Sequence, residues 1–141
     1  ATREDGGFDD FSESTPVIVQ YNGVCMKEFP MSINTFAGRK FTVTGGGYFR
    51  FFPYRWMRNM IAKADYTMTY FHPRDFDPKQ PVLEGLSLKR KFKSYYNLSK
   101  SYVKFKQLIY DFDFIDMRSA ASIVNWKNVP VVDLNHYLHN K

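Results

Sequence analysis

A histidine follows a run of apolar and β-branched residues and precedes proline and acidic residues in TYFHPRDFDP (69–78). A neutral imidazole with an unperturbed pKa of about 6.5 donates or accepts a proton near neutral pH. Asp75 and Asp77 are close enough in sequence to orient the ring of His72. Two interpretations stay open: His72 is an acid–base group that lines a pocket, or it caps a turn that the aspartates help to close.

A second candidate segment, TGGGYFRFFPY (44–54), joins an expected strand to an expected helix through Gly45, Gly46 and Gly47. Glycine lets the backbone approach a ligand closely, and a helix N-terminus favours anions. The spacing matches neither the dinucleotide-binding fingerprint nor a Walker loop, so it gives little support for nucleotide binding. Arg50 is able to bind a carboxylate, a phosphate or a buried aspartate. The alternative is that the glycines form a tight structural turn.

Two further patterns carry weaker signals. LKRKFKSYYN (88–97) interleaves basic and aromatic residues, as surfaces that bind single-stranded nucleic acid do, but one short basic patch is more typical of a solvated helix face. We therefore expect no nucleic-acid partner. Asp133, His136 and His139 would spread across a helix surface instead of converging, so we expect no metal site in this segment.

Composition sets the limits of the interpretation. The 141 residues correspond to about one domain, and 44% of them are apolar, as in globular proteins. Aromatic residues make up 18%, which predicts either heavy core packing or flat surfaces on which sugars or bases stack. The net charge of +6 favours acidic partners. Cys25 is the single cysteine, so no internal disulfide forms, which is consistent with a reducing compartment.

Turn residues and hydrophobic periodicity predict the secondary structure. Asn22 and Gly23 predict a hairpin between the β-prone runs 16–23 and 24–33. No apolar run approaches the ~18 residues of a membrane span. The other expected elements are strands over 40–49, 66–72 and 111–116, helices over 53–64, 99–112 and 119–126, and a long connection over 73–98 with one basic helical turn.

Alternating strands and helices after residue 40 favour an α/β fold. The apolar strand expected over 66–72 should be buried on both faces, with Tyr70 and His72 on one side and Phe71 on the other. His72 would then stand at the carboxyl end of a strand, which is where active sites gather in such folds.

Four segments, taken together and in order, resemble a known family: EFPMSI, GGGYFRFFPY, TYFHPRDFDPKQP and KFKSYYNL. They are similar to the C-terminal half of bacterial polysaccharide deacetylases of the exopolysaccharide-locus subgroup, members of the NodB-like carbohydrate esterase group. The resemblance covers residues 3–117. It implies the C-terminal portion of a distorted (β/α) barrel over 16–126, with the hairpin near its start, a loop over 1–15 and a tail over 127–141.

The resemblance also implies a function. These hydrolases remove N- or O-acetyl groups from a sugar with the help of a divalent metal, often zinc. His72 looks like the late histidine that protonates the leaving group, and Arg50, Asp75, Gly45, Gly46, Gly47 and Tyr48 look like substrate-binding or orienting residues.

This chain departs from the family pattern at the metal site. The family's early Asp and H-x-x-x-H pair have no counterpart here, because GFDDF (7–11) is followed by no such pair. We therefore expect that the metal-binding half lies upstream, that this chain holds no metal and is inactive alone, and that it associates with itself or with that half. A cytoplasmic location is favoured. The alternative function is a non-catalytic module that binds a glycan or another acidic polymer.

Overall fold

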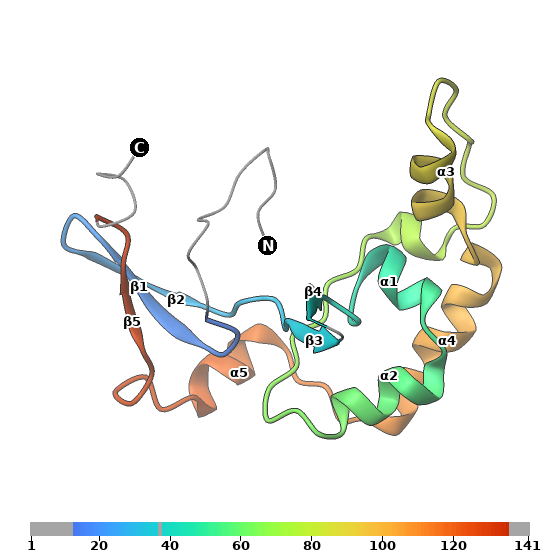
Figure 1. The fold of residues 1–141 in the computed structure, drawn as a ribbon. Helices are drawn as coiled ribbons and strands as arrows, with labels where there is room; N and C mark the ends of the chain where they lie inside the picture. The colour runs from blue at the N-terminus through green and yellow to red at the C-terminus, as the bar shows by residue number, and fades with distance from the viewer. Residues whose placement is uncertain (1–12, 37, 136–141) are drawn as a thin grey trace. The chain divides into compact units, whose positions relative to one another are not determined.

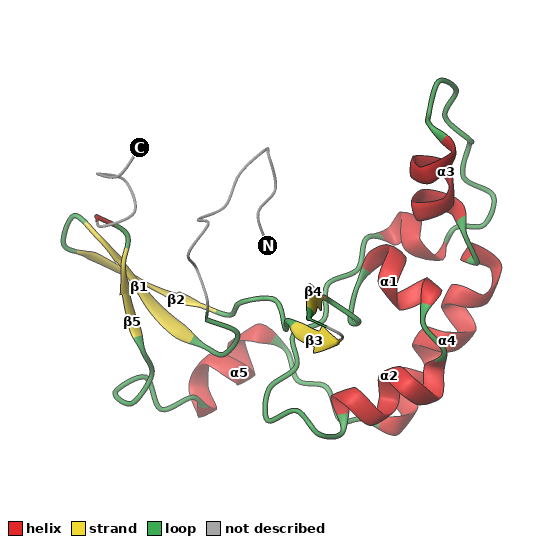
Figure 2. Cartoon of the chain, viewed as in Figure 1, coloured by secondary structure: helices red, strands yellow, loops and turns green. Residues whose placement is uncertain are grey.

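The computed structural model describes residues 13–36 and 38–135, which form a mixed α/β architecture (Figure 1). The described residues form five α-helices and short strands, which can be followed in Figure 2. Contacts divide the chain into two compact units, Ala1–Met31 with Ile115–Lys141 and Ser32–Phe114. No helix in the described part of the chain is long and apolar enough to cross a membrane.

The first unit is built on the predicted hairpin. β1 (Val17–Tyr21) pairs antiparallel with β2 (Val24–Glu28). Asn22 and Gly23 connect them with φ values of 48° and 79°, which are the left-handed conformations that a tight hairpin turn requires. This confirms the hairpin. β5 (Val131–Asp133), which the sequence analysis missed, pairs in parallel with β1 and gives the strand order β2-β1-β5.

A short helix, α5 (Met117–Ile123), completes the described part of this unit. Its N-cap is Asp116, whose carboxylate accepts a hydrogen bond from the backbone N of Ser119 at 2.8 Å. The helix confirms the expectation for 119–126 and begins two residues earlier. The strand expected over 111–116 is wrong, because α4 runs to Asp111 and Asp116 is committed to capping.

The second unit consists mainly of helices: α1 (Gly46–Phe51), α2 (Tyr54–Ile61), α3 (Leu88–Tyr95) and α4 (Leu98–Asp111). It also contains the 3₁₀ helix η1 (Pro73–Phe76) and a small hairpin of β3 (Asn34–Phe36) and β4 (Arg39–Phe41). α2 and α4 confirm the helices expected over 53–64 and 99–112. The glycine run does not remain a turn, because its second glycine begins α1.

The core of this unit joins α1, α2 and α4. Its buried side chains are Val43, Phe49, Met57, Ile61 and Leu108. Phe71, Phe76 and Phe105 pack against them, with ring centroids 4.8–5.4 Å apart. Much of the aromatic content is therefore core packing.

The segment 66–72 is extended but is not a strand buried on both faces, so that expectation is wrong. A single parallel bridge joins Gly45 and Tyr70, where the backbone N of Tyr70 donates to the carbonyl of Thr44 at 3.1 Å. The side chain of Thr44 donates to the carbonyl of Met68 at 2.7 Å. The start of α1 at Gly46 ends this pairing after one bridge, and Tyr70 stays 54% exposed. The barrel portion that the resemblance implies stays a prediction.

Candidate functional site around His72

His72 is the N-cap residue of η1 and is exposed. Its ring meets the ring of Tyr70 edge-on, with centroids 4.8 Å apart and an interplanar angle of 78°. Phe71 turns the other way and packs against Phe49 at 4.8 Å. Alternation along 70–72 therefore places Tyr70 and His72 on one side, as expected even though the segment lacks a regular ladder. The imidazole of His72 is therefore accessible to solvent and lies beside the exposed phenol ring of Tyr70.

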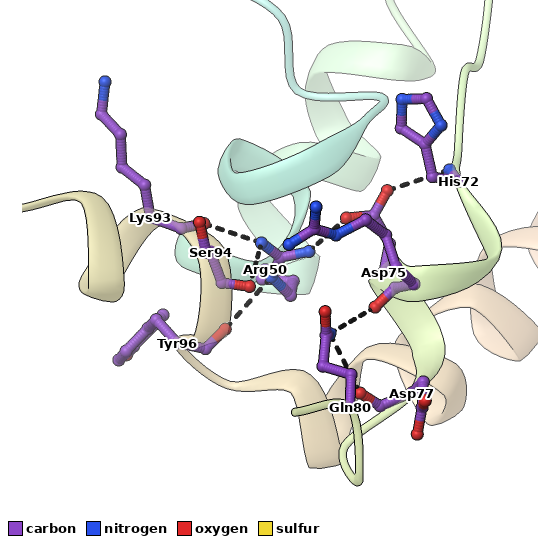
Figure 3. Close-up of polar contacts among 9 residues, drawn as sticks. Arg50, His72, Asp75, Asp77, Gln80, Lys93, Ser94 and Tyr96 are labelled. Carbon is purple, nitrogen blue, oxygen red and sulfur yellow. Dashed lines mark hydrogen bonds and ion pairs between the residues drawn. The ribbon is translucent and has the colours of Figure 1, made fainter. Parts of the chain in front are cut away.

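Asp75 fixes the main chain at His72. Its Oδ2 accepts a hydrogen bond from the backbone N of His72 at 3.0 Å, and its own backbone N donates to the carbonyl of His72 at 2.9 Å. The carboxylate is buried. Asp75 was expected to orient the histidine ring, whereas these bonds act on the backbone. Figure 3 shows the ring of His72 extending away from Asp75.

Arg50 is the centre of the buried part of the site (Figure 3). Its Nη1 donates to Oδ1 of Asp75 at 2.5 Å, in an ion pair whose side chains are 3% and 9% exposed. Its remaining bonds reach backbone carbonyls at the end of α3: Nη2 donates to Lys93 at 2.8 Å and Ser94 at 3.3 Å, and Nε donates to Tyr96 at 3.1 Å. Of the three partners considered for Arg50, the structure gives the buried aspartate.

The glycines allow two backbones to approach each other. A Cβ added at Gly47 would lie 3.0 Å from the carbonyl oxygen of Lys93, the same oxygen that Arg50 binds. Gly46 has a φ of 52°, which favours glycine. Gly45 provides the bridge to Tyr70. The close approach thus occurs between α1 and the end of α3.

Tyr48, the remaining expected site residue, lies on α1 and is 47% exposed. Its ring stacks on Phe52, with centroids 6.1 Å apart and planes at 17°. The ring of Phe41 lies at a centroid distance of 6.1 Å. The structure therefore places Tyr48 in an aromatic cluster on α1.

Two ionisable groups next to the core have shifted pKa values. Lys104 donates its ammonium to the carbonyl oxygens of Phe49, at 2.6 Å, and Phe52, and burial lowers its pKa to about 8. Tyr54 donates to Oδ2 of Asp111 at 2.8 Å, and burial together with this bond raises the pKa of Tyr54 to about 12. Both contacts attach α4 to the helices before it, so their role is structural.

The described residues do not fit the zinc that the resemblance implies. Across residues 13–36 and 38–135, no three His, Cys, Asp or Glu side chains come together to hold a metal ion. The carboxylate of Asp133 accepts from the backbone N and the side-chain amide of Asn135, at 2.9 and 2.8 Å. His136 and His139 lie outside the described residues.

Two parts of the site were not named from the sequence as site groups: the side chain of Tyr70 and the backbone carbonyls at the end of α3. Tyr70 was recognisable, since alternation already placed it beside His72. The carbonyls of Lys93, Ser94 and Tyr96 left no sequence signal, because any residue type offers a carbonyl oxygen.

Comparison with known proteins gives a family and no characterised relative. No curated protein and no solved structure matches the chain. One family model matches residues 1–122, most of the chain. The chain belongs to the family described as a domain of unknown function, DUF3473.

Proposed function

We propose that this chain is the C-terminal region of a polysaccharide deacetylase and that His72 donates a proton to the sugar group that leaves the acetyl carbon. The family is associated with C-terminal regions of polysaccharide deacetylases, which supports this assignment. The observation that carries the role of His72 is that an exposed imidazole stands on a main chain fixed by the buried Arg50–Asp75 pair.

Burying an ion pair to stabilise a turn carries a large desolvation cost. Removing two charges from water costs several kcal/mol per ion, which the pair recovers only with good geometry and further hydrogen bonds. Here those further bonds connect α1, η1 and the end of α3. A catalytic group must be held within about 0.5 Å of its productive position, and this connection fixes the backbone from which the ring of His72 extends.

The proposed step is a single proton transfer. When the tetrahedral intermediate collapses, the bond from the acetyl carbon to the sugar nitrogen or oxygen breaks and its electron pair stays on that atom. The imidazolium of His72 donates its proton there and becomes neutral. The role that we propose for the described residues is proton donation and positioning.

His72→Gln in the protein that contains this chain tests the proposal. We expect acetate release from an acetylated polysaccharide to fall by about 10²–10⁴, the usual loss when a general acid is removed. The alkaline limb of the pH–rate profile should disappear, because that limb reports deprotonation of the acid. Arg74→Ala is the matched control, since Arg74 is an exposed neighbour on η1. Full turnover in His72→Gln would refute the role of His72.

A non-catalytic glycan-binding module is the second candidate. Exposed rings at Phe51, Phe92 and Tyr96 favour it, because flat apolar rings suit the faces of sugars. This function predicts glycan binding without any acetate release from the wild-type protein.

A further inference from the structure

α3 and the end of α1 carry an exposed aromatic group. Phe51 is 52% exposed, Phe92 49% and Tyr96 41%. The rings of Phe92 and Tyr96 lie 4.5 Å apart at 32°, and each lies 6.2 Å from the ring of Phe51. Leu88, one helical turn before Phe92, is 86% exposed. The three rings form a continuous aromatic surface, and Leu88 lies one turn away on the same helix face. We call these four residues the α3 surface.

α3 is rich in basic side chains, and Lys89 and Lys93 flank this surface by their spacing from Phe92 and Tyr96. Of the eight residues of α3, Lys89, Arg90, Lys91 and Lys93 are basic and none is acidic. The ion pairs described in the structure involve only Arg50 and Arg58 as cations, so the α3 side chains stay available. Like charges four residues apart, such as Lys89 and Lys93, destabilise an isolated helix. An anionic ligand would remove that repulsion.

The α3 surface is held rigidly to the site. Arg50 binds the carbonyls of Lys93, Ser94 and Tyr96 with the same guanidinium that pairs with Asp75. At the other side of α3, the hydroxyl of Tyr95 donates to the carbonyl of Pro81 at 3.2 Å and accepts from the backbone N of Leu83 at 3.0 Å. Aromatic rings that are positioned before binding lose little entropy on contact.

We propose that the α3 surface binds an anionic polysaccharide, with sugar rings on Phe51, Phe92 and Tyr96 and sugar carboxylates on Lys89 and Lys93, which lie three residues before Phe92 and Tyr96 and therefore flank these rings. This inference rests on the proposed function and specifies its substrate class as a polymer that carries uronic acids. Flat rings suit the apolar faces of sugars, and ammonium and guanidinium groups bind carboxylates through charge-assisted hydrogen bonds. One guanidinium fixes both α3 and the turn of His72, so the polymer is bound on a scaffold continuous with the proton donor.

Binding is measured without turnover, with polygalacturonate, neutral dextran and oligothymidylate as the probes. Calorimetric titration of the protein that contains this chain should show polygalacturonate as the tightest ligand, with affinity that falls as salt is added. The double variant Lys89→Ala/Lys93→Ala should bind polygalacturonate about fivefold more weakly, as expected from two exposed charge pairs. Phe92→Ala should also weaken binding.

The matched control is Arg55→Ala/Lys63→Ala, which removes the same charge from exposed residues of the same unit that lie off α3. Equal loss in this control, equal affinity for dextran, or a preference for oligothymidylate would each overturn the inference, the last in favour of single-stranded nucleic acid.

Acetate release separates the two proposals. A protein that binds polygalacturonate as described but releases no acetate from an acetylated polysaccharide refutes the enzymatic proposal and keeps this inference. A protein that releases acetate while binding neutral and acidic glycans equally refutes this inference alone.

Discussion

Removing the carboxylate of Asp75 should both destabilise the second unit and release the turn of His72. In Asp75→Ala, the guanidinium of Arg50 stays buried at 3% side-chain exposure and loses the only acidic side chain with which it pairs in the described structure. Its bonds to the carbonyls of Lys93, Ser94 and Tyr96 compensate no charge. An uncompensated buried charge is the main physical consequence of this substitution.

The expected magnitude follows from the kind of contact. Breaking a buried ion pair by removing one partner costs about 3–5 kcal/mol of unfolding free energy. The lost bond from the backbone N of His72 adds about 1 kcal/mol. Arg50→Met should cost at least as much, since it leaves Asp75 charged and three carbonyls without this donor. Arg50→Met/Asp75→Ala should cost less than the two single losses added together, by a coupling of about 2–3 kcal/mol.

Urea unfolding of the wild type, the two single variants and the double variant measures the four free energies of unfolding from which this coupling is calculated. Hydrogen exchange in peptides from α1, η1 and α3 locates the change, and it should accelerate in these elements in Asp75→Ala. Asp77→Ala is the matched control, because Asp77 is exposed and lies two residues away. A loss below 1 kcal/mol in Asp75→Ala, or strictly additive losses in the double variant, would refute the reasoning.

Gly47→Ala should destabilise the protein by about 1–3 kcal/mol, because the new methyl lies 3.0 Å from the carbonyl oxygen of Lys93; a stability unchanged in urea unfolding contradicts this. Burial lowers the pKa of Lys104 to about 8 from 10.5, so the folded state binds fewer protons than the unfolded chain between these values. The stability of wild type relative to Lys104→Met should therefore rise as pH increases from about 8 to 10.5; a fall is the opposing result. The pKa of Tyr54 is raised from 10.0 to about 12 by burial and by its bond to Asp111. The free energy of unfolding of the wild type relative to Tyr54→Phe should therefore fall as pH increases between these values. A difference that stays constant with pH would contradict this.

Local sequence signals were sufficient for elements that local chemistry determines. Asn22 and Gly23 predicted the hairpin because the left-handed conformations they adopt are costly for most other residues. The helix expected over 53–64 rests on the spacing of Tyr54, Met57 and Ile61, and Met57 and Ile61 are buried on α2. On α4 the helical spacing places Tyr102, Phe105 and Ile109 on one face, and of these Phe105 packs against the core. Tyr102 and Ile109 are about half exposed, whereas Leu108 is buried. Hydrophobic spacing along α4 therefore did not determine which face of this helix packs against the core.

Elements that depend on distant partners were not predictable. β5 is three residues long and exists through its pairing with β1, far away in sequence. For the site, residue types suggested that Arg50 and Asp75 belong near His72, but not that they pair with each other. The bonds to the end of α3 depend on tertiary packing, which a single sequence does not reveal.

The parallel pairing of β1 with β5 has implications for the order of events during synthesis. Ile18 lies opposite Val131, so closing this contact brings together residues roughly 110 positions apart, which is entropically unfavourable and slow. Ser32–Phe114 is continuous in sequence and has its own core, so a ribosome delivers all of it before β5 emerges. The edge of β1 that β5 covers is thus left bare on the nascent chain until then, and during that interval it can template pairing with another polypeptide.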